Sequence, residues 1–389
     1  MITKIFRPAL VIFTLCIAIT ACDDAIDIEE HRRADADKYM IAVAHPLAAQ
    51  AGYDVLSKGG SAVDAAIAVE TVLTLVEPQS SGIGGGAFLV HFDADKHLVQ
   101  TFDGRETAPA SATPDMFVGP DGNPMPWPKA ATGGLSVGVP GVIRMLELAH
   151  SQHGVLPWAD LFSRAIDLAE NGFEVTPRLA RLLAGESEMP NIPGTQDYFY
   201  PDGAPLRAGD TSKNPAYAAV LRTVANDGAA AFYSGDIAKG IASTVSNAPF
   251  NPTPMTIEDI ASYQAKERPP VCAPYRQYRV CGMGPPSSGG ILVAQVLGML
   301  SHFDLPSMEP FSAEAVHLLV EASRLAFADR ALYVGDSDFV PVPVRGLVDR
   351  AYLRQRAQLI DSANRIEDAT AGRAGQHAWQ WAPDTDPEK

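Results

Sequence analysis

Residues 78–109 read PQSSGIGGGAFLVHFDADKHLVQTFDGRETAP, and this stretch decides which fold the rest of the chain supports. Its glycine-rich part, residues 80–86, allows positive φ angles and a close approach of the backbone to another group. Residues 87–92 and 97–102 are predicted to form the two strands of a hairpin, with a turn at residues 93–96. The stretch therefore predicts a glycine-rich turn followed by antiparallel sheet.

Arg105 follows the second predicted strand, directly after Asp103-Gly104. A guanidinium at a strand end, with Glu106 and Thr107 beside it, can bind a carboxylate through two parallel hydrogen bonds. We therefore predict that Arg105 anchors the carboxylate of a substrate. The alternative is a surface ion pair between Arg105 and either Glu106 or Asp103.

The composition indicates a globular protein with a sizeable core, because 47% of the 389 residues are apolar and 20% are charged. The formal net charge of -16 argues against nucleic acid as a partner, since nucleic acid binds basic patches. We predict no metal site, because the nine histidines are scattered along the chain and no Cys-x-x-Cys spacing occurs. We also predict no cofactor, because the glycines lack the Lys-Ser/Thr of a phosphate loop and do not match a dinucleotide fingerprint.

Residues 1–21 are predicted to be a signal peptide. Lys4 and Arg7 give it a positively charged start, and residues 9–20 form an apolar run that is too short to span a bilayer as a helix. We therefore expect an exported protein.

The signal ends at Ile19-Thr20-Ala21-Cys22, which resembles the lipidation signal of bacterial lipoproteins. On this interpretation Cys22 becomes the lipidated N-terminus and anchors the protein to a membrane, in the periplasm or the cell envelope. The alternative is an ordinary signal peptide that is cut after Ala21. Residues 22–38 are acidic and polar, and we predict that they form a tether.

Cys272 and Cys281 flank a predicted hairpin. A two-residue turn at residues 276–277 would pair Tyr275 with Tyr278 and would therefore place the two cysteines opposite each other. An oxidising compartment would allow a disulfide between them. Arg-Gln is poor turn chemistry for such a hairpin, so a buried pair of thiols is the alternative.

The remaining elements are predicted from periodicity and from caps. Helices are expected over residues 46–58, 62–76, 142–150, 157–172, from Thr176-Pro177 onward, 215–227, 235–246, a short one capped by Thr256 and Asp259, 291–300, 312–333 and 348–360. Strands are expected over residues 39–44 and 133–139, loops over 113–132 and 189–207, and a structureless polar tail over 363–389. Helices combined with adjacent hairpins indicate an α+β fold with antiparallel sheet layered against helices.

Five segments resemble the gamma-glutamyltranspeptidases, in the order and spacing of that family. They are SSGIGGGAF (residues 80–88), DGRETAP (103–109), VGVPGVI (137–143), PPSSGG (285–290) and ADRALYVGDSDFVPVPVRGL (328–347). Several long motifs in register are far more specific than a lone glycine pattern. The resemblance covers residues 39–359, and we assign residues 39–362 to one large-subunit-like domain.

The resemblance implies the four-layer αββα sandwich of the N-terminal-nucleophile hydrolases. It also implies a precursor that cleaves itself into a large and a small subunit, in which the new N-terminal threonine of the small subunit is the nucleophile. The family transfers the γ-glutamyl group of glutathione or similar amides to water or an amino acid. Arg105 matches the family arginine that binds the α-carboxylate of that group.

No residue of this chain matches the nucleophilic threonine, and Thr385 is no substitute because its amine lies in a peptide bond. We therefore expect a large-subunit part that is inactive alone and needs a small subunit as its partner. The alternatives are a truncated inactive copy, a non-catalytic γ-glutamyl-binding lipoprotein, and an acylase acting on another amide.

Two further clusters are assigned structural roles. Ser287 and Ser288 have no histidine at a telling distance, and they are interpreted as the entry turn and N-cap of a helix. Asp329 and Arg330 are interpreted as members of a structural ion-pair cluster.

Overall fold

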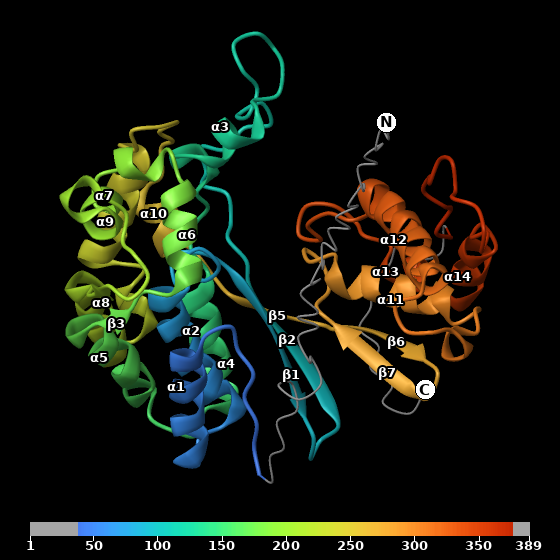
Figure 1. The fold of residues 1–389 in the computed structure, drawn as a ribbon, viewed down its shortest axis with the longest axis horizontal. Coiled ribbons are helices and arrows are strands. Elements are labelled where there is room, and N and C mark those ends of the chain that lie inside the picture. The colour runs from blue at the N-terminus through green and yellow to red at the C-terminus, as the bar shows by residue number, and fades with distance from the viewer. Residues whose placement is uncertain (1–37, 376–389) are drawn as a thin grey trace, which may run out of the picture. The chain divides into compact units, whose positions relative to one another are not determined.

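The computed structural model describes residues 38–375 (Figure 1). The predicted signal peptide, Cys22, nearly all of the predicted tether and residues 376–389 of the predicted tail lie outside these residues. The described chain from Ile41 onward belongs to one structural unit.

Three small antiparallel sheets carry the strands of this unit. The strands are β1 (Ala87–Asp93), β2 (Leu98–Gly104), β3 (Phe173–Glu174), β4 (Thr211–Ser212), β5 (Lys266–Arg268), β6 (Val271–Tyr275) and β7 (Tyr278–Gly282). The sheets have the orders β1-β2-β5, β3-β4 and β6-β7. The hairpin expected after the glycine-rich turn is therefore present as β1 and β2, and its sheet gains β5 from a segment about 160 residues later in the chain.

Helices make up the rest of the regular structure. The α-helices before β5 are α1 (Pro46–Ser57), α2 (Ala62–Val76), α3 (Trp127–Ala131), α4 (Val142–His153), α5 (Ser163–Asn171), α6 (Pro177–Gly185), α7 (Thr195–Phe199), α8 (Pro215–Asp227), α9 (Gly235–Ser246) and α10 (Ile257–Ala261). Those after β7 are α11 (Gly289–Leu300), α12 (Ala313–Tyr333), α13 (Val344–Leu347) and α14 (Arg350–Ala357). Short 3-10 helices are η1 (Gly134–Ser136), η2 (Trp158–Phe162), η3 (Met189–Asn191), η4 (Pro201–Gly203), η5 (Ala229–Ala231) and η6 (Leu305–Ser307). The combination of helices with antiparallel sheets confirms the predicted α+β class.

The N-terminal helices share one large hydrophobic core. Ile67 of α2, Ile143 of α4 and Phe102 of β2 are fully buried in it. α2 is apolar on nearly all faces, as the sequence predicted, because α1, α4 and α5 all contact it. The packing of α4 against β2 fixes the strand that leads to Arg105.

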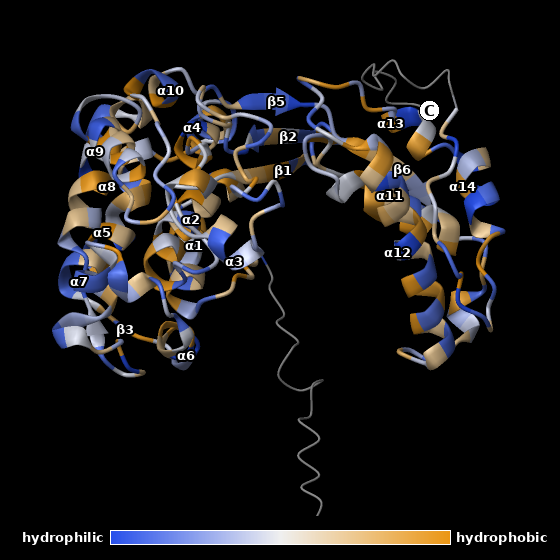
Figure 2. Cartoon of the chain, turned by 90° about the horizontal axis from the view of Figure 1, so that it is seen from above, coloured by the Kyte–Doolittle hydropathy of each residue, from blue (hydrophilic) through white to orange (hydrophobic). Residues whose placement is uncertain are grey.

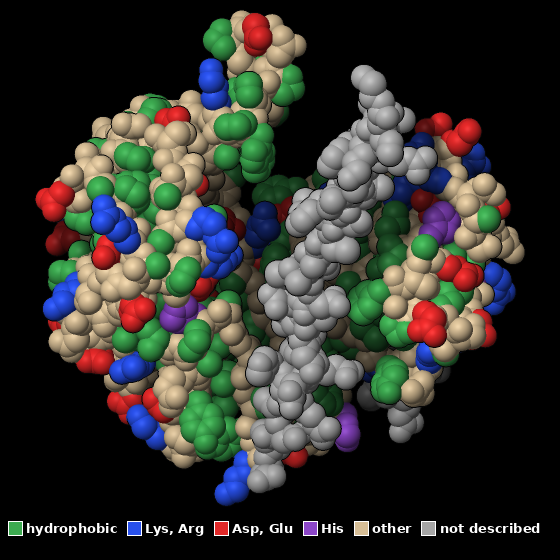
Figure 3. Space-filling model, in the orientation of Figure 1, with side chains coloured by type: hydrophobic (Ala, Val, Ile, Leu, Met, Phe, Trp, Pro, Cys, Tyr) green, Lys and Arg blue, Asp and Glu red, His purple; other side chains and the backbone are tan. Residues whose placement is uncertain are grey.

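A second core joins the C-terminal helices. Leu318 and Leu325 of α12 and Ile291 of α11 are buried in it. α12 also exposes large hydrophobic side chains, among them Leu319 and Phe327, so it is not amphipathic with a single apolar stripe. Figure 2 shows hydrophobic and hydrophilic residues alternating around this helix, and Figure 3 shows hydrophobic side chains gathered over the C-terminal helices.

Three predicted helix N-caps are confirmed by side-chain hydrogen bonds. Ser61 and Asp64 form a capping box at α2, and Thr256 and Asp259 form another at α10. Thr176 accepts a hydrogen bond from the Leu179 N–H at the start of α6. These local pairs hold because they need no partner from elsewhere in the chain.

Several predicted segments differ in the structure. Residues 113–132, predicted to be a loop, contain the short helix α3, whose proline lies in the first turn, where a helix tolerates it. Residues 39–44 are not a strand, because no described strand lies beside them to accept their backbone hydrogen bonds. Residues 133–139 contain the 3-10 helix η1, whose backbone N–H groups donate hydrogen bonds to the carbonyls of residues 250–251. Within this segment only Val139 makes a β-bridge, to Thr107. Residues 189–207 contain the short elements η3, α7 and η4, which pack on α6 through a small core of their own.

The predicted structureless tail is fixed over its first part. Ile366 donates its N–H to Glu321 of α12, and Gly372 donates its N–H to Asp329 (both 2.8 Å). Arg356 of α14 donates to the Thr370 carbonyl. Residues 364–372 therefore lie against α12 and α14, because buried helix side chains satisfy the backbone of a segment that has no periodicity of its own.

Candidate substrate-binding site

Arg105 is held by its backbone on both sides. Its N–H donates to Asp103 Oδ1 (2.8 Å), and its carbonyl accepts from the Tyr263 hydroxyl (2.7 Å). Tyr263 is buried, and burial raises the pKa of its hydroxyl further above neutral pH. The Cα of Arg105 is therefore fixed at the end of β2.

The Arg105 side chain is 63% exposed, and the nearest carboxylate oxygen is Glu106 Oε2, 3.6 Å from Nε. Its guanidinium does not pair with Asp103, so one of the two ion pairs considered from the sequence is wrong and the other is a long, solvent-exposed contact. An exposed pair of this kind contributes little, about 0–1 kcal/mol. The guanidinium is therefore available to a ligand.

Asp103 is occupied by another arginine. Its Oδ2 accepts from Arg268 Nε of β5 (2.5 Å), and Arg268 in turn binds Asp338 through Nη1 (3.0 Å) and Nη2 (2.7 Å). Lys266 Nζ lies 2.6 Å from the same Asp338 carboxylate. Hydrogen bonds from Arg268 and then Lys266 hold the pKa of Asp338 below its ordinary value. Hydrogen bonds to Asp338 and then Asp103 raise the pKa of Arg268.

The glycine-rich turn lies beside Arg105. A Cβ on Gly86 would overlap the Glu106 carboxylate, and a Cβ on Gly141 would overlap the Gly104 carbonyl. Gly85 accepts the Gly141 N–H through its carbonyl (2.8 Å), which joins the turn to the start of α4. Glycine is needed here for close approach, whereas residues 82–86 do not use the positive φ that the sequence allowed.

Half-buried side chains of α2 hold the other end of this turn. Ser81 donates to Glu70 Oε1 (2.8 Å), and the Ile83 N–H donates to Thr74 Oγ1 (3.2 Å). Burial raises the pKa of Glu70, while the bond from Ser81 lowers it. The turn therefore has a fixed position on α2.

Cys272 and Cys281 are directly opposite each other in the β6–β7 hairpin and are joined by a disulfide. The register is the predicted one, with Tyr275 opposite Tyr278. Arg276 takes a φ of 53°, which explains how the unfavourable Arg-Gln sequence makes the turn. The hairpin packs against α11 and lies outside the contacts of Arg105.

The two clusters assigned structural roles differ in detail from the prediction. Ser287 accepts the Gly289 N–H (3.1 Å), whereas Ser288 occupies the N-cap position of α11 without a capping bond and accepts from Arg330 Nε (3.0 Å). Asp329 pairs with Arg356 and not with Arg330. Neighbouring residues on a helix point about 100° apart, so Asp329 faces the core and Arg330 faces outward.

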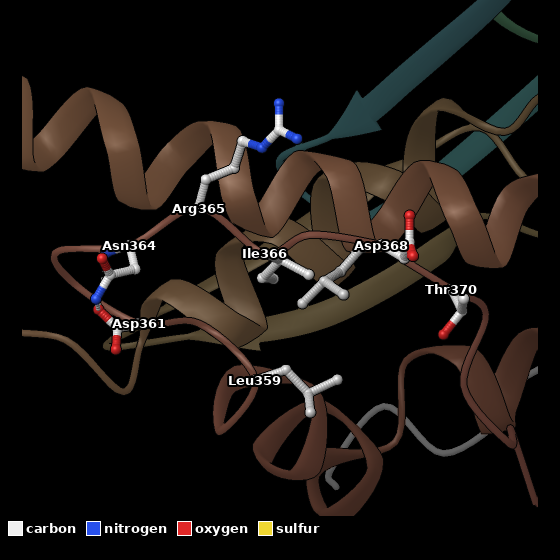
Figure 4. Close-up of a pocket in the computed structure, with 8 residues that line it drawn as sticks. Leu359, Asp361, Asn364, Arg365, Ile366, Asp368 and Thr370 are labelled. Atoms are coloured by element: carbon white, nitrogen blue, oxygen red, sulfur yellow. Dashed lines mark hydrogen bonds between the residues drawn. The ribbon is translucent and has the colours of Figure 1, made fainter.

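The cavity drawn in Figure 4 has a volume of about 320 Å³ and contains none of the predicted site residues. Two of its polar groups are engaged locally, because Asp361 accepts the Ala363 and Asn364 N–H groups. Arg365 points away from Leu359 and Asp361 (Figure 4). A second cavity of about 250 Å³ is lined by Arg268, Asp338 and neighbouring prolines, next to the charged network.

No group of three or more potential metal ligands occurs within residues 38–375. Among the helices of this described part, none has the length and apolarity needed to cross a bilayer. Sequence reasoning missed Tyr263, Arg268 and Asp338, which reach Arg105 directly or through Asp103. Their only signal was the position of Asp338 within the quoted segment 328–347.

Comparison with known proteins gives a consistent result. The family model described as Gamma-glutamyltranspeptidase matches residues 48–386. The chain is 40% identical over 334 residues to the glutathione hydrolase proenzyme of Bacillus subtilis, covering 86% of this chain and 56% of that protein. It is 35% identical over 354 residues to the acylase ACY 1 proenzyme of a Pseudomonas species, covering 89% of this chain and 62% of that protein.

A solved structure shows the same fold. Helicobacter pylori gamma-glutamyltranspeptidase superposes with a TM-score of 0.83 and 33% identity, covering 88% of this chain and 98% of that solved chain. The present chain thus spans a little over half the length of the curated relatives it matches, and nearly all of one solved chain.

Proposed function

Because the chain belongs to the gamma-glutamyltranspeptidase family, we propose that it is the large-subunit part of an exported γ-glutamyltransferase or glutathione hydrolase. Its substrates are glutathione or other γ-glutamyl amides, and its partner is a second chain that carries an N-terminal threonine nucleophile. The protein transfers the γ-glutamyl group to water or an amino acid only when both parts are present.

The observation that carries this proposal is the state of Arg105. Its backbone is fixed by Asp103 and Tyr263, while its guanidinium is exposed and, among residues 38–375, pairs only at a long distance with Glu106. A fixed and unshared guanidinium fits a carboxylate through two parallel hydrogen bonds. The α-carboxylate of a γ-glutamyl group supplies such a ligand.

The proposed division of labour is simple. Arg105 binds and orients the donor, the α-amine of the second chain's threonine acts as base, and the threonine oxygen attacks the γ-carbonyl. The amide C–N bond then breaks, and the amine leaves with the proton that the base took from the threonine hydroxyl. Water or an amine finally cleaves the ester that remains, which releases the γ-glutamyl product and restores the threonine. The large-subunit part contributes binding and orientation, and holding reactants in the right geometry lowers the barrier of enzyme reactions in general.

The test is release of p-nitroaniline from γ-glutamyl-p-nitroanilide. Turnover is expected from this chain combined with a threonine-bearing second chain, and none from this chain alone. Arg105→Lys should raise KM strongly in the combined enzyme, because an ammonium cannot reproduce the planar fork. Sustained turnover by the chain alone, or an unchanged KM in the variant, contradicts the proposal.

The second candidate function is that of an acylase acting on another amide. The support for it is the 35% identity to an acylase proenzyme. A glutaryl amide retains the carboxylate that Arg105 would bind but lacks the α-amine. Faster turnover of glutaryl-p-nitroanilide than of γ-glutamyl-p-nitroanilide by the combined enzyme favours the acylase.

We also propose that Cys22 is lipidated after export and anchors the protein to a membrane of the cell envelope. The support is the sequence of residues 19–22 after an apolar run. Labelled palmitate should be incorporated into the wild-type protein and lost in Cys22→Ser. Incorporation that survives in Cys22→Ser contradicts the anchor.

A further inference from the structure

We propose that Arg268 and Asp338 are positioning residues that fix Arg105 through Asp103, an inference that rests on the proposed function of Arg105. Neither side chain contacts the Arg105 guanidinium. Their effect on the substrate therefore passes through one shared carboxylate.

The register of β5 against β2 places Lys266, Arg268 and Asp103 close together. Arg268 of β5 is opposite Thr101 of β2, and Lys266 is opposite Asp103. Alternate residues of a strand point to the same face, so Arg268 lies diagonal to Asp103 on one face of the sheet. The pairing of β5 with β2 thus delivers a guanidinium to the carboxylate that precedes Arg105.

Asp103 joins the network to Arg105. Its side chain is 6% exposed, and its two oxygens have different partners: Oδ1 accepts the Arg105 N–H and Oδ2 accepts Arg268 Nε. Rotation of the carboxylate would break both bonds together. Arg268 therefore fixes the orientation in which Asp103 holds the Arg105 backbone.

Arg268 is fixed from its other side. Its side chain is only 13% exposed, and its two terminal nitrogens bind both oxygens of Asp338. Asp338 lies between α12 and α13, in a turn where Asp336 accepts its N–H (2.9 Å). A planar fork bound at both ends has one orientation, which a lysine could not reproduce.

The network itself does not compensate the charge of Arg105. Lys266 and Arg268 carry two positive charges, and Asp103 and Asp338 carry two negative charges. The cluster is therefore neutral by itself and does not neutralise the substrate-binding guanidinium. The cluster fixes the position of Arg105 and leaves its guanidinium charge to the ligand carboxylate.

The experiment uses the combined enzyme with γ-glutamyl-p-nitroanilide as donor. Arg268→Gln and Asp338→Asn are compared with Arg222→Gln, which removes an ion pair to Glu170 away from the site. The thermal midpoint is measured for every variant. Since Arg268→Gln removes partly buried bonds, the more exposed Asp338→Asn provides a second variant if Arg268→Gln folds poorly.

We expect Arg268→Gln to raise KM about tenfold and Asp338→Asn to raise it severalfold, with kcat changed less than KM and Arg222→Gln like wild type. In an Arg105→Gln background, Arg268→Gln should have no further effect on KM. A purely structural role predicts equal effects in both backgrounds, and that result overturns the inference.

The two failures can be told apart. If Arg105→Gln leaves KM unchanged, the proposed function of Arg105 is wrong, whatever Arg268 does. If Arg105→Gln raises KM but both Arg268→Gln and Asp338→Asn behave like Arg222→Gln, the substrate role stands and only the positioning inference is wrong.

Discussion

Two carboxylates of this protein, Asp103 and Asp329, bind an arginine and a backbone N–H in the same way but serve different purposes. Asp329 accepts from Gly372 N–H (2.8 Å), Tyr352 hydroxyl (2.7 Å) and Gln295 Nε2 (2.9 Å), and it pairs with Arg356 (3.1 Å). Every group in that cluster is buried or partly buried. The Asp329 cluster therefore holds the chain together.

The Asp103 cluster uses the same kinds of bond and leaves one arginine free. Asp103 takes the backbone of Arg105 and the side chain of Arg268, so the Arg105 guanidinium remains exposed. The difference teaches that residue type alone does not single out Arg105, the proposed ligand-binding arginine. What distinguishes Arg105 is a fixed backbone combined with an exposed guanidinium.

The largest effect on stability should come from removing the buried carboxylate of Asp329. Asp329→Ala leaves Arg356 buried without its counter-charge, and we expect a loss of about 3–5 kcal/mol in the free energy of unfolding. The control is Asp167→Ala, which breaks the exposed pair with Arg164 and should cost under about 1 kcal/mol. Denaturant unfolding measures both, and equal losses would contradict the stabilising role of the Asp329 cluster.

Removing the disulfide tests how much the β6–β7 hairpin contributes to stability, separately from the candidate binding site. Replacing both Cys272 and Cys281 by alanine should lower the unfolding free energy by about 2.5 kcal/mol, because a bridge across so short a loop removes that much chain entropy from the unfolded state. KM of the combined enzyme should not change. Thiol titration of the denatured protein should find two more thiols after reduction than before it, and an unchanged number would show that the bridge is absent.

Much of the fold could be predicted because it depends on neighbours in sequence. The capping boxes at Ser61 and Thr256 and the register of the cysteine hairpin need only a few adjacent residues. The Arg105 position followed from a strand end and a motif. In contrast, Arg268 is 165 residues from Asp103, and no local sequence pattern predicts their hydrogen bond.

The segment 364–372 shows the same limit. Its sequence is polar and without periodicity, so it predicts no element. Asp329 and Glu321 nevertheless bind its backbone, because helix α12 buries both carboxylates where that segment passes. The prediction that Asp329 and Arg330 belong to one cluster failed for a related reason: adjacency in a helix separates side chains instead of joining them.

A smaller effect should follow from loosening the other side of the Arg105 backbone. Tyr263→Phe removes the hydroxyl that donates to the Arg105 carbonyl and should cost about 1 kcal/mol of stability. We expect KM for γ-glutamyl-p-nitroanilide to rise severalfold as well. A stability loss with an unchanged KM would place Tyr263 with the structural cluster instead of the binding site.

The smallest effect concerns pH at the glycine-rich turn. Burial raises the pKa of Glu70 above its unfolded value, so the folded state favours the protonated acid. The resulting penalty is absent below the unfolded pKa of about 4.5 and grows as pH rises through the folded pKa. Glu70→Gln should therefore gain stability relative to wild type at pH 7 compared with pH 4, and an unchanged difference between the two pH values would contradict this.

The most direct measurement compares two donors in wild type and Arg105→Gln. The first donor is γ-glutamyl-p-nitroanilide, and the second is 4-aminobutyryl-p-nitroanilide, which lacks only the α-carboxylate. We predict that the wild-type combined enzyme prefers the first donor strongly in kcat/KM and that Arg105→Gln loses most of this preference, since the bond to the carboxylate is gone. An equal preference in both enzymes would contradict the account of Arg105 as the carboxylate anchor.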